Sequence, residues 1–285
     1  MCGRYTIVTK LKVIEKRFGV NSSEGEYTQN TNVSTGEMAP VITGDQPDKL
    51  QFFQFGYTPS WAQKKVYVIN ARSEGDHNKE NDRNYTGAMG IINKPMFRRS
   101  IRSKRCLVIA DCFIEGPQKE KLKKPYVVYL KDGKRPFAFA GIWDEWTDKE
   151  SGEITKSFAV ITTVSNDVTE QIGHHRSPVI LSKEDEKKWL NEGTPLGEAL
   201  DLLRPYPGEL MNAYPISAEI RSPSANGVEL LLPIGERINK EYDFEIYNEI
   251  KLEGMGETAA RERKNNEGRQ GTLFWFVTFY WKSIT

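Results

Sequence analysis

Short apolar runs dominate the hydrophobic pattern of this 285-residue chain. Runs rich in Val, Ile, Phe and Tyr alternate with Gly, Pro and charged residues, a pattern typical of β-strands. We expect strands at residues 2–8, 50–56, 66–69, 106–113, 126–130, 137–142 and 158–163. The tetrapeptide Lys131-Asp132-Gly133-Lys134 predicts a hairpin turn between two of these strands.

Helical signals are fewer. Residues 11–18 place apolar side chains at 11, 13, 14 and 18, which indicates a short amphipathic segment. Ser182, followed by acidic residues and then Trp189, predicts a helix that the serine caps. Because short strands outnumber helices, the sequence predicts a β-rich α+β fold, with a strongly curved or barrel-like mixed sheet core and flanking helices.

The chain changes character near residue 235. We therefore expect one domain at residues 1–235 and a C-terminal extension of unknown role at residues 236–285. The extension is polar up to residue 268 and densely aromatic at 272–281. That aromatic run is too short to span a bilayer as a helix, so we interpret it as an added strand or an interface patch.

Charge is balanced overall but uneven along the chain. There are 40 Lys and Arg against 39 Asp and Glu, a formal charge of +1, which argues against a histone-like polycation. Residues 94–135 hold 13 basic and 4 acidic residues, a net of +9 that leaves −8 for the remainder. This segment is interpreted as a solvated surface hairpin or as a local groove for phosphates.

The cysteine and histidine content bounds the chemistry. Three cysteines are a poor disulfide framework, and neither they nor the three histidines show metal-ligand spacing, so no structural zinc site is expected. The N-terminus has no apolar signal region, and no stretch is long and apolar enough to span a membrane. We expect a soluble, cytoplasmic protein.

Cys2 is the most informative residue. Removal of Met1 would leave it with a free α-amine beside its thiol, and both groups are partly nucleophilic at neutral pH. The amine can form a Schiff base with an aldehyde, and the thiol can then close a five-membered thiazolidine on the same carbon. This chemistry suits a covalent trap for aldehydes or an N-terminal-nucleophile hydrolase.

Such a nucleophile needs groups that move protons and hold the substrate. Glu115 ends an apolar strand, where partial burial would raise its pKa, although an exposed strand-end carboxylate fits this segment equally well. His174 and His175 enter another apolar run, and on extended backbone only one of them faces a given site. Asn70 and Arg72 follow a strand and offer an amide and a guanidinium.

Together these residues resemble the SOS response-associated peptidase (SRAP) family over about residues 1–220. The motifs occur in family order: Met1-Cys2-Gly3-Arg4-Tyr5, Asn32-Val33 to Pro40-Val41-Ile42, Gly56-Tyr57-Thr58-Pro59-Ser60-Trp61, Asn70-Ala71-Arg72-Ser73-Glu74, Arg105-Cys106-Leu107-Val108 to Phe113-Ile114-Glu115, Phe139-Ala140-Gly141-Ile142-Trp143, Ile161-Thr162-Thr163, His174 with Arg176-Ser177-Pro178-Val179-Ile180-Leu181, and Met211-Asn212-Ala213-Tyr214-Pro215-Ile216-Ser217.

The resemblance implies a DNA-repair protein that crosslinks itself to abasic sites in single-stranded DNA and shields them. By this resemblance Cys2 is the nucleophile, Asn70 orients the N-terminus and the adduct, Glu115 is the acid/base, and His174 assists sugar opening and reversal. Arg4 and Arg72 match positions that contact DNA phosphates. It implies no metal and no cofactor, and we expect a monomer that associates with the nucleoid when it binds DNA.

The sequence departs from the family pattern at three places. Gly116 stands where the family usually has a tryptophan that can stack on a base. Ser34-Thr35-Gly36 replaces a usual Ala-Pro-Thr, and Phe55 replaces a tryptophan. These changes put the family's base stacking and loop rigidity in question for this chain, but not the covalent chemistry. His174 keeps the family order, but an exchange of roles with His175 stays open.

Two other functions remain open from the sequence. One is a cysteine-type peptidase, whose substrate could be its own Met1. A lyase-type strand cleavage is a variant of the leading hypothesis. The other is a non-covalent single-strand-binding module that uses residues 94–135 and the aromatic tail. Its binding would be salt-sensitive and independent of Cys2.

Overall fold

The computed structural model describes residues 3–22, 27–131 and 133–241. Its strands are β1 Arg4–Ile7, β2 Asn21–Ser22, β3 Asn30–Val33, β4 Met38–Thr43, β5 Gln46–Phe55, β6 Asn70–Arg72, β7 Arg105–Ala110, β8 Cys112–Glu115, β9 Tyr126–Leu130, β10 Phe137–Thr147, β11 Ile154–Val164, β12 Arg176–Pro178, β13 Ile180–Leu181 and β14 Met211–Pro215. The α-helices are α1 Leu11–Phe18, α2 Ser100–Ser103, α3 Asp167–Gln171, α4 Lys183–Leu190 and α5 Leu196–Asp201. Short 3-10 helices are η1 Gly90–Asn93, η2 Lys121–Lys123, η3 Gly208–Leu210, η4 Ala218–Arg221 and η5 Val228–Leu231.

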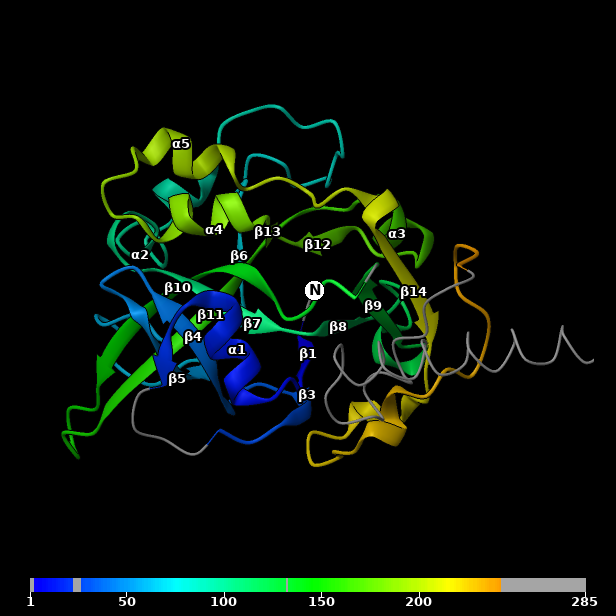
Figure 1. The fold of residues 1–285 in the computed structure, drawn as a ribbon. Helices are drawn as coiled ribbons and strands as arrows, with labels where there is room; N and C mark the ends of the chain where they lie inside the picture. The colour runs from blue at the N-terminus through cyan, green and yellow to red at the C-terminus, as the bar shows by residue number, and fades with distance from the viewer. Residues whose placement is uncertain (1–2, 23–26, 132, 242–285) are drawn as a thin grey trace, which may run out of the picture.

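The strands form two sheets (Figure 1). The smaller sheet has the order β14-β9-β8-β1-β3, and the larger one contains the path β12-β11-β10-β7-β4-β5-β2, with β13 on β10 and β6 on β11. Parallel and antiparallel pairs are mixed, since β6 runs parallel to β11 and β12 runs antiparallel to it. The predicted β-rich α+β fold with a barrel-like mixed sheet core is confirmed.

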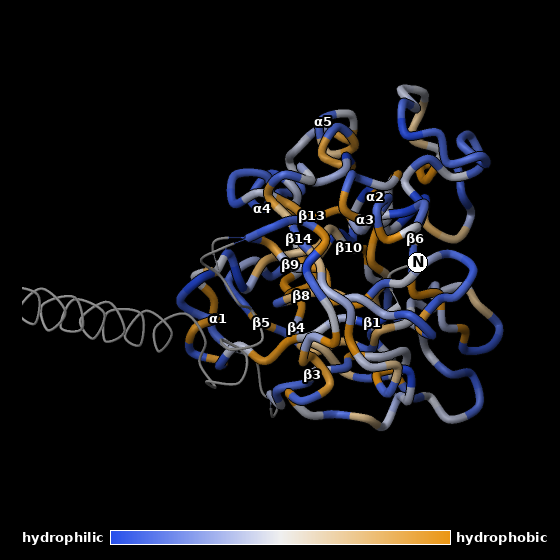
Figure 2. Tube along the Cα trace, turned by 90° about the vertical axis from the view of Figure 1, so that its right-hand side faces the viewer, coloured by the Kyte–Doolittle hydropathy of each residue, from blue (hydrophilic) through white to orange (hydrophobic). Residues whose placement is uncertain are grey.

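Aromatic side chains join the two sheets. Tyr5 of β1 makes edge contacts with Phe55 of β5 and Phe139 of β10, with ring centroids 5.6 and 5.9 Å apart. All three side chains are fully buried. Hydrophobic residues gather on the strands, whereas the connecting loops are largely hydrophilic (Figure 2). The first strand is therefore held firmly against the core.

Strand β11 organises the part of the fold that matters for function. Beyond its pairing with β10, its C-terminal half pairs with β6 through Val160↔Asn70 and Thr162↔Arg72. It also pairs with β12 through Val164↔Arg176. Segments about a hundred residues apart in sequence thus meet on one strand.

Two predicted helices agree with the structure, and two cysteines are buried in the core. Helix α1 spans the predicted residues 11–18, and Ser182 caps α4 by accepting a hydrogen bond from the backbone N–H of Asp185. Cys106 and Cys112 are fully buried, as expected of core residues. Burial raises the pKa of the Cys112 thiol to about 12, so this thiol is chemically inert at neutral pH.

The predicted strand at residues 106–113 is in fact two strands in different sheets. The chain breaks at Asp111, which is buried. Its carboxylate accepts hydrogen bonds from the backbone N–H groups of Val8 and Thr9, at 2.6 and 2.8 Å, and from the hydroxyl of Thr9 at 2.5 Å. In a continuous strand the Asp111 carboxylate would not reach these donors, and they would stay unsatisfied. Strand β7 therefore ends before Asp111, and β8 begins after it.

Two other expectations at loops were wrong. Residues 66–69 contribute only an isolated bridge, between Val68 and Tyr57, and the strand begins four residues later than predicted, at Asn70. The turn at residues 131–134 does not close a hairpin between β9 and β10. These strands belong to different sheets, because β9 pairs with β8 and β14 while β10 pairs with β7 and β11.

The C-terminal part of the described chain packs on β14. Backbone N–H groups of Ile234 and Ile238 donate to the carbonyls of Pro215 and Ala213, and Glu241 accepts from Tyr129 at 2.6 Å. The aromatic run at 272–281 lies outside the described residues. Among the described helices, none has the length and apolar character needed to cross a bilayer.

Replacing Asp111 with alanine should leave three buried donors without their acceptor. We expect Asp111→Ala to lower the free energy of unfolding by about 3 kcal/mol, because each lost hydrogen bond to a buried charge is costly. Urea denaturation measures the change. Asp48→Ala, at an exposed position of β5, is the matched control and should have little effect. Equal stability of the two variants would contradict the role given to Asp111.

Candidate active site

Two of the predicted site residues meet at the centre of the fold. The carboxyl of Glu115, at the end of β8, lies 3.6 Å from Nε2 of His174. Glu115 is 4% exposed and His174 is 5% exposed. Of the two adjacent histidines, His174 is the one whose ring contacts Glu115 in the described part of the chain, while His175 is half-buried and packs on the His174 ring.

The turn after α3 fixes the His174 ring. Gly173 adopts φ 86°, a left-handed conformation that reverses the chain at the helix end. The backbone N–H of His174 donates to the carbonyl of Thr169, and Nδ1 lies 3.0 Å from the carbonyl oxygen of Arg176. If Nδ1 carries the proton toward that carbonyl, the lone pair of Nε2 faces Glu115.

Burial shifts both groups toward their neutral forms. It raises the pKa of Glu115 above its ordinary value, against the opposing hydrogen bond from the Gly116 N–H. It lowers the pKa of His174 to about 4. Burial therefore disfavours an ion pair between these two side chains.

A buried ion pair supports this arrangement. The Arg176 guanidinium donates to Glu74 at 2.8 Å and to the carbonyl oxygen of Thr162 at 2.8 Å. Glu74 and Arg176 are 1% and 3% exposed. Burial by itself would raise the pKa of Glu74, but the hydrogen bond and charge of Arg176 hold it below its usual value. Glu74 is therefore an anion that neutralises the buried arginine.

Arg72 and Asn70 belong to the same assembly through β6. Nε of Arg72 lies 3.8 Å from the Glu74 carboxylate, and the Arg72 side chain is 31% exposed. Asn70 is two residues before Arg72, so it shares the same face of the strand. Its amide nitrogen donates to the carbonyl of Ile69 at 2.8 Å.

Glu74 and Arg176 are the residues whose roles the sequence reasoning missed. Both residues belong to motifs that carry the family resemblance, but neither was assigned a role from the sequence. The signal was present as alternation: positions 70, 72 and 74 are polar, and the small residues Ala71 and Ser73 lie between them. A strand with this pattern turns one polar row toward a site.

Arg4 occupies a different position. It pairs with Ile114 across β1 and β8, so its side chain leaves the sheet on the face opposite to that of Glu115. Its guanidinium donates to Asn32 at 3.2 Å and to the carbonyl of Arg221 at 3.0 Å. The contacts described for Arg4 do not join it to the Glu115–His174 pair, and its contact with phosphate stays a prediction.

Cys2 lies outside the described residues, but the register of its neighbours is defined. Arg4 is opposite Ile114 and Tyr5 is opposite Phe113. Continuing this antiparallel register by one step sets Gly3 opposite Glu115. The first strand therefore begins beside the buried acid.

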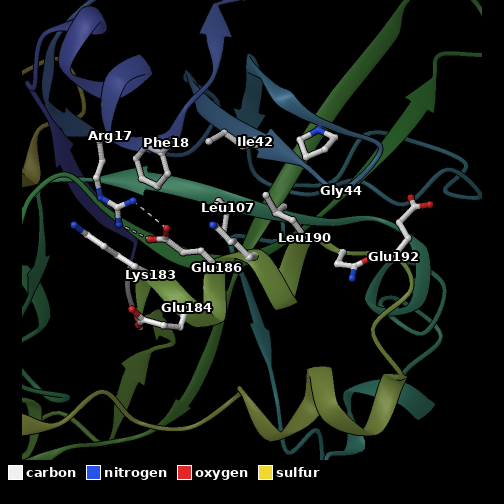
Figure 3. Close-up of a pocket in the computed structure, with 13 residues that line it drawn as sticks. Arg17, Phe18, Ile42, Gly44, Leu107, Lys183, Glu184, Glu186, Leu190 and Glu192 are labelled. Carbon is white, nitrogen blue, oxygen red and sulfur yellow. Dashed lines mark hydrogen bonds and ion pairs between the residues drawn. The ribbon is translucent and has the colours of Figure 1, made fainter.

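A cavity lies away from these residues. A cavity of about 1020 Å³ lies between α1, the β4–β5 turn and α4 (Figure 3). Its wall carries the ion pair between Arg17 and Glu186, 2.7 Å apart, beside apolar side chains such as Phe18 and Leu107. None of the predicted site residues lines it. In the described ranges, no group of three or more His, Cys, Asp or Glu side chains could hold a metal ion.

The structure is a β-barrel-like protein with a buried carboxyl–imidazole pair, Glu115 and His174, beside the start of its first strand. Comparison with known proteins gives the family. Residues 1–223 match the family model described as SOS response associated peptidase (SRAP), and the chain belongs to this family. The resemblance seen in the sequence is thereby confirmed.

Two similar proteins, one bacterial and one from a vertebrate, are both named abasic site processing proteins. The chain is 34% identical over 239 residues to the abasic site processing protein YoqW of Bacillus subtilis, covering 81% of this chain and 99% of the relative. It is 27% identical to the abasic site processing protein HMCES of Gallus gallus, covering 76% of this chain and 70% of the relative. A crystal structure of a Bacteroides thetaiotaomicron protein aligns with a TM-score of 0.69 at 30% identity, over 81% of this chain and 99% of that one.

The pH dependence of stability should report the buried His174. Its pKa is about 4 in the folded chain and 6.5 ordinarily, so the unfolded chain binds the proton first as the pH falls. The wild type should therefore lose stability between pH of about 6.5 and about 4, and His174→Asn should lose less over that window. Urea midpoints at several pH values measure this difference. Parallel profiles for the two proteins would contradict the burial argument.

Proposed function

We propose that the chain links itself covalently to abasic sites in single-stranded DNA through Cys2, after removal of Met1. The observation that carries the proposal is the Glu115–His174 contact beside the start of β1, in a member of a family whose relatives are named abasic site processing proteins. Cys2 is bonded to Gly3, so covalent geometry keeps its Cα within about 3.8 Å of the Gly3 Cα.

The proposed reaction is a condensation. The α-amine of Cys2 adds to the aldehyde carbon of the ring-opened sugar, and loss of one water gives an imine. The thiol sulfur then adds to that carbon, its proton passes to the imine nitrogen, and a thiazolidine forms. No oxidant or reductant is consumed.

The neighbouring residues have distinct proposed roles. Glu115, with its raised pKa, gives a proton to the leaving hydroxyl, and it takes a proton back from the attacking water when the link reverses. His174 takes and returns the sugar hydroxyl proton during ring opening, for which a neutral imidazole is required. Asn70 orients the N-terminus and the adduct, while Arg72 and Arg4 contact phosphates. We expect the protein to act as a monomer in the cytoplasm, on nucleoid DNA.

The first test is the formation of the adduct. Wild-type protein whose Met1 loss is verified by mass spectrometry should give a denaturation-resistant species with single-stranded DNA that carries one abasic site. Its mass should equal protein plus DNA less one water. Cys2→Ala should give none, whereas Cys112→Ala, which removes a buried thiol, should still react.

Two controls sharpen this assay. Reducing the abasic aldehyde with borohydride before mixing should abolish the adduct, and intact DNA should give none. An adduct that survives in Cys2→Ala, or no adduct with wild type, would overturn the proposal.

The pH–rate profile should identify Glu115 as the acid. The rate should rise with pH as the amine deprotonates and fall as Glu115 loses its proton, because protonated Glu115 is the active form. Glu115→Gln should slow adduct formation by about 100-fold or more and remove the descending limb. Single-turnover rates from quenched samples measure this. A variant that is slow but keeps the wild-type descending limb would assign that limb to another group.

Removal of Met1 by the chain itself is the second candidate function, favoured by the peptidase in the family description. It predicts that Met1 is lost in a host without methionine aminopeptidase, and retained there in Glu115→Gln. Persistence of Met1 in the wild type in that host would exclude it. A lyase activity would instead appear as strand cleavage at the abasic site, and Cys2→Ser, which keeps the amine, tests it.

A further inference from the structure

A basic loop at residues 117–124 lies next to Gly116, one of the departures from the family pattern. It directly follows Glu115 and Gly116 and contains Lys119, Lys121, Lys123 and Lys124 with a single acid, Glu120. All four lysines are exposed. Lys124 lies 3.4 Å from Glu120, which leaves the loop with a net charge of +3.

Gly116 is required by the way this loop folds back. A Cβ at this position would overlap the carbonyl oxygen of Lys121 and lie 2.9 Å from that of Lys124. Any larger side chain, including the tryptophan usual in the family, would displace the loop. The observed fold of the loop therefore requires a glycine at position 116.

The loop has a fixed place beside the candidate active site. The Gln118 N–H donates to the carbonyl of Gly173 at 3.0 Å, one residue before His174. Leu122 packs against a cluster of buried hydrophobic side chains that includes Ile114. Lys121 adopts φ 52°, a left-handed conformation that tertiary contacts must hold in a non-glycine residue.

This placement argues against an incidental solvated charge run. The start of the loop directly follows Glu115 and Gly116, and Gln118 bonds it to the backbone next to His174. The loop therefore begins beside the buried pair, and its lysines are exposed to solvent. A lysine ammonium on a long, flexible stem is suited to a phosphate as a mobile point charge.

We propose that the loop at residues 117–124 is a phosphate-binding element that holds the DNA backbone next to the reacting nucleotide, in place of base stacking at position 116. The inference rests on the proposed function and names the part of the substrate that these residues recognise. The ligand chemistry is the single-strand phosphate backbone, read without regard to base identity.

Salt-dependent binding tests the loop separately from the covalent reaction. Binding is measured with the full chain carrying Cys2→Ala and an intact, fluorescein-labelled single-stranded oligonucleotide, so no adduct can form. The triple change Lys119→Gln, Lys121→Gln and Lys123→Gln should make the slope of log K against log salt less negative by about 2, at about 0.7 per phosphate contact.

The matched control removes the same charge from other surfaces. Lys49→Gln, Lys149→Gln and Lys188→Gln change exposed lysines of β5, of the turn after β10 and of α4. This control should shift the slope by less than about 0.5. A loop variant with an unchanged slope, or a control with an equal shift, would overturn the proposal. Loop-dependent binding of polyglutamate as tight as that of DNA would overturn it in favour of an acidic protein partner.

Failure of the loop and failure of the covalent function give different results. With Cys2 present, the loop variant at saturating DNA and low salt should reach the wild-type adduct yield, because the loop binds and does not react. Adduct formation with an unchanged salt slope would reject the loop alone. A loop-dependent slope without any wild-type adduct would reject the covalent function and leave the loop as a DNA contact.

Discussion

The buried ion pair between Arg176 and Glu74 is the constraint on which the candidate site depends. Two charges with almost no exposure must satisfy each other, because an unpaired charge in this position would cost several kcal/mol. Glu74 follows β6, Arg176 begins β12, and the second acceptor of Arg176 is the carbonyl of Thr162 on β11. The pair therefore fixes three strands relative to one another.

The same arginine also fixes the imidazole, through its backbone. Its carbonyl oxygen lies 3.0 Å from Nδ1 of His174, so a shift of β12 would move the ring away from Glu115. Burial in this environment raises the pKa of Glu115 and lowers the pKa of His174, so it disfavours the charged form of each group. The Arg176–Glu74 pair holds the strands in place, and the strands hold the Glu115–His174 contact.

The sequence predicted the fold class because alternation and short apolar runs are local signals. It could not place the break at Asp111, because that residue is surrounded by apolar ones and its three donors belong to Val8 and Thr9, which directly follow the first strand. For the same reason residues 131–134 looked like a hairpin: turn chemistry is local, whereas the exchange of sheets between β9 and β10 is decided by long-range pairing. Glu115 and His174 were found through the order of motifs, and their contact required the tertiary structure.

The basic segment at 94–135 shows how the fold divides a charge run that looks uniform in sequence. Arg105 is buried and donates to the carbonyl oxygens of Trp189 and Asn191, so its charge serves helix α4 and the core. The strands β7, β8 and β9 occupy much of the rest of the segment with buried side chains. The lysines of residues 117–124 remain on the surface, in the loop that follows Glu115 and bonds to the backbone next to His174. An overall charge near zero is therefore compatible with strong local attraction for phosphate, since the attraction depends on which charges the fold brings to the site.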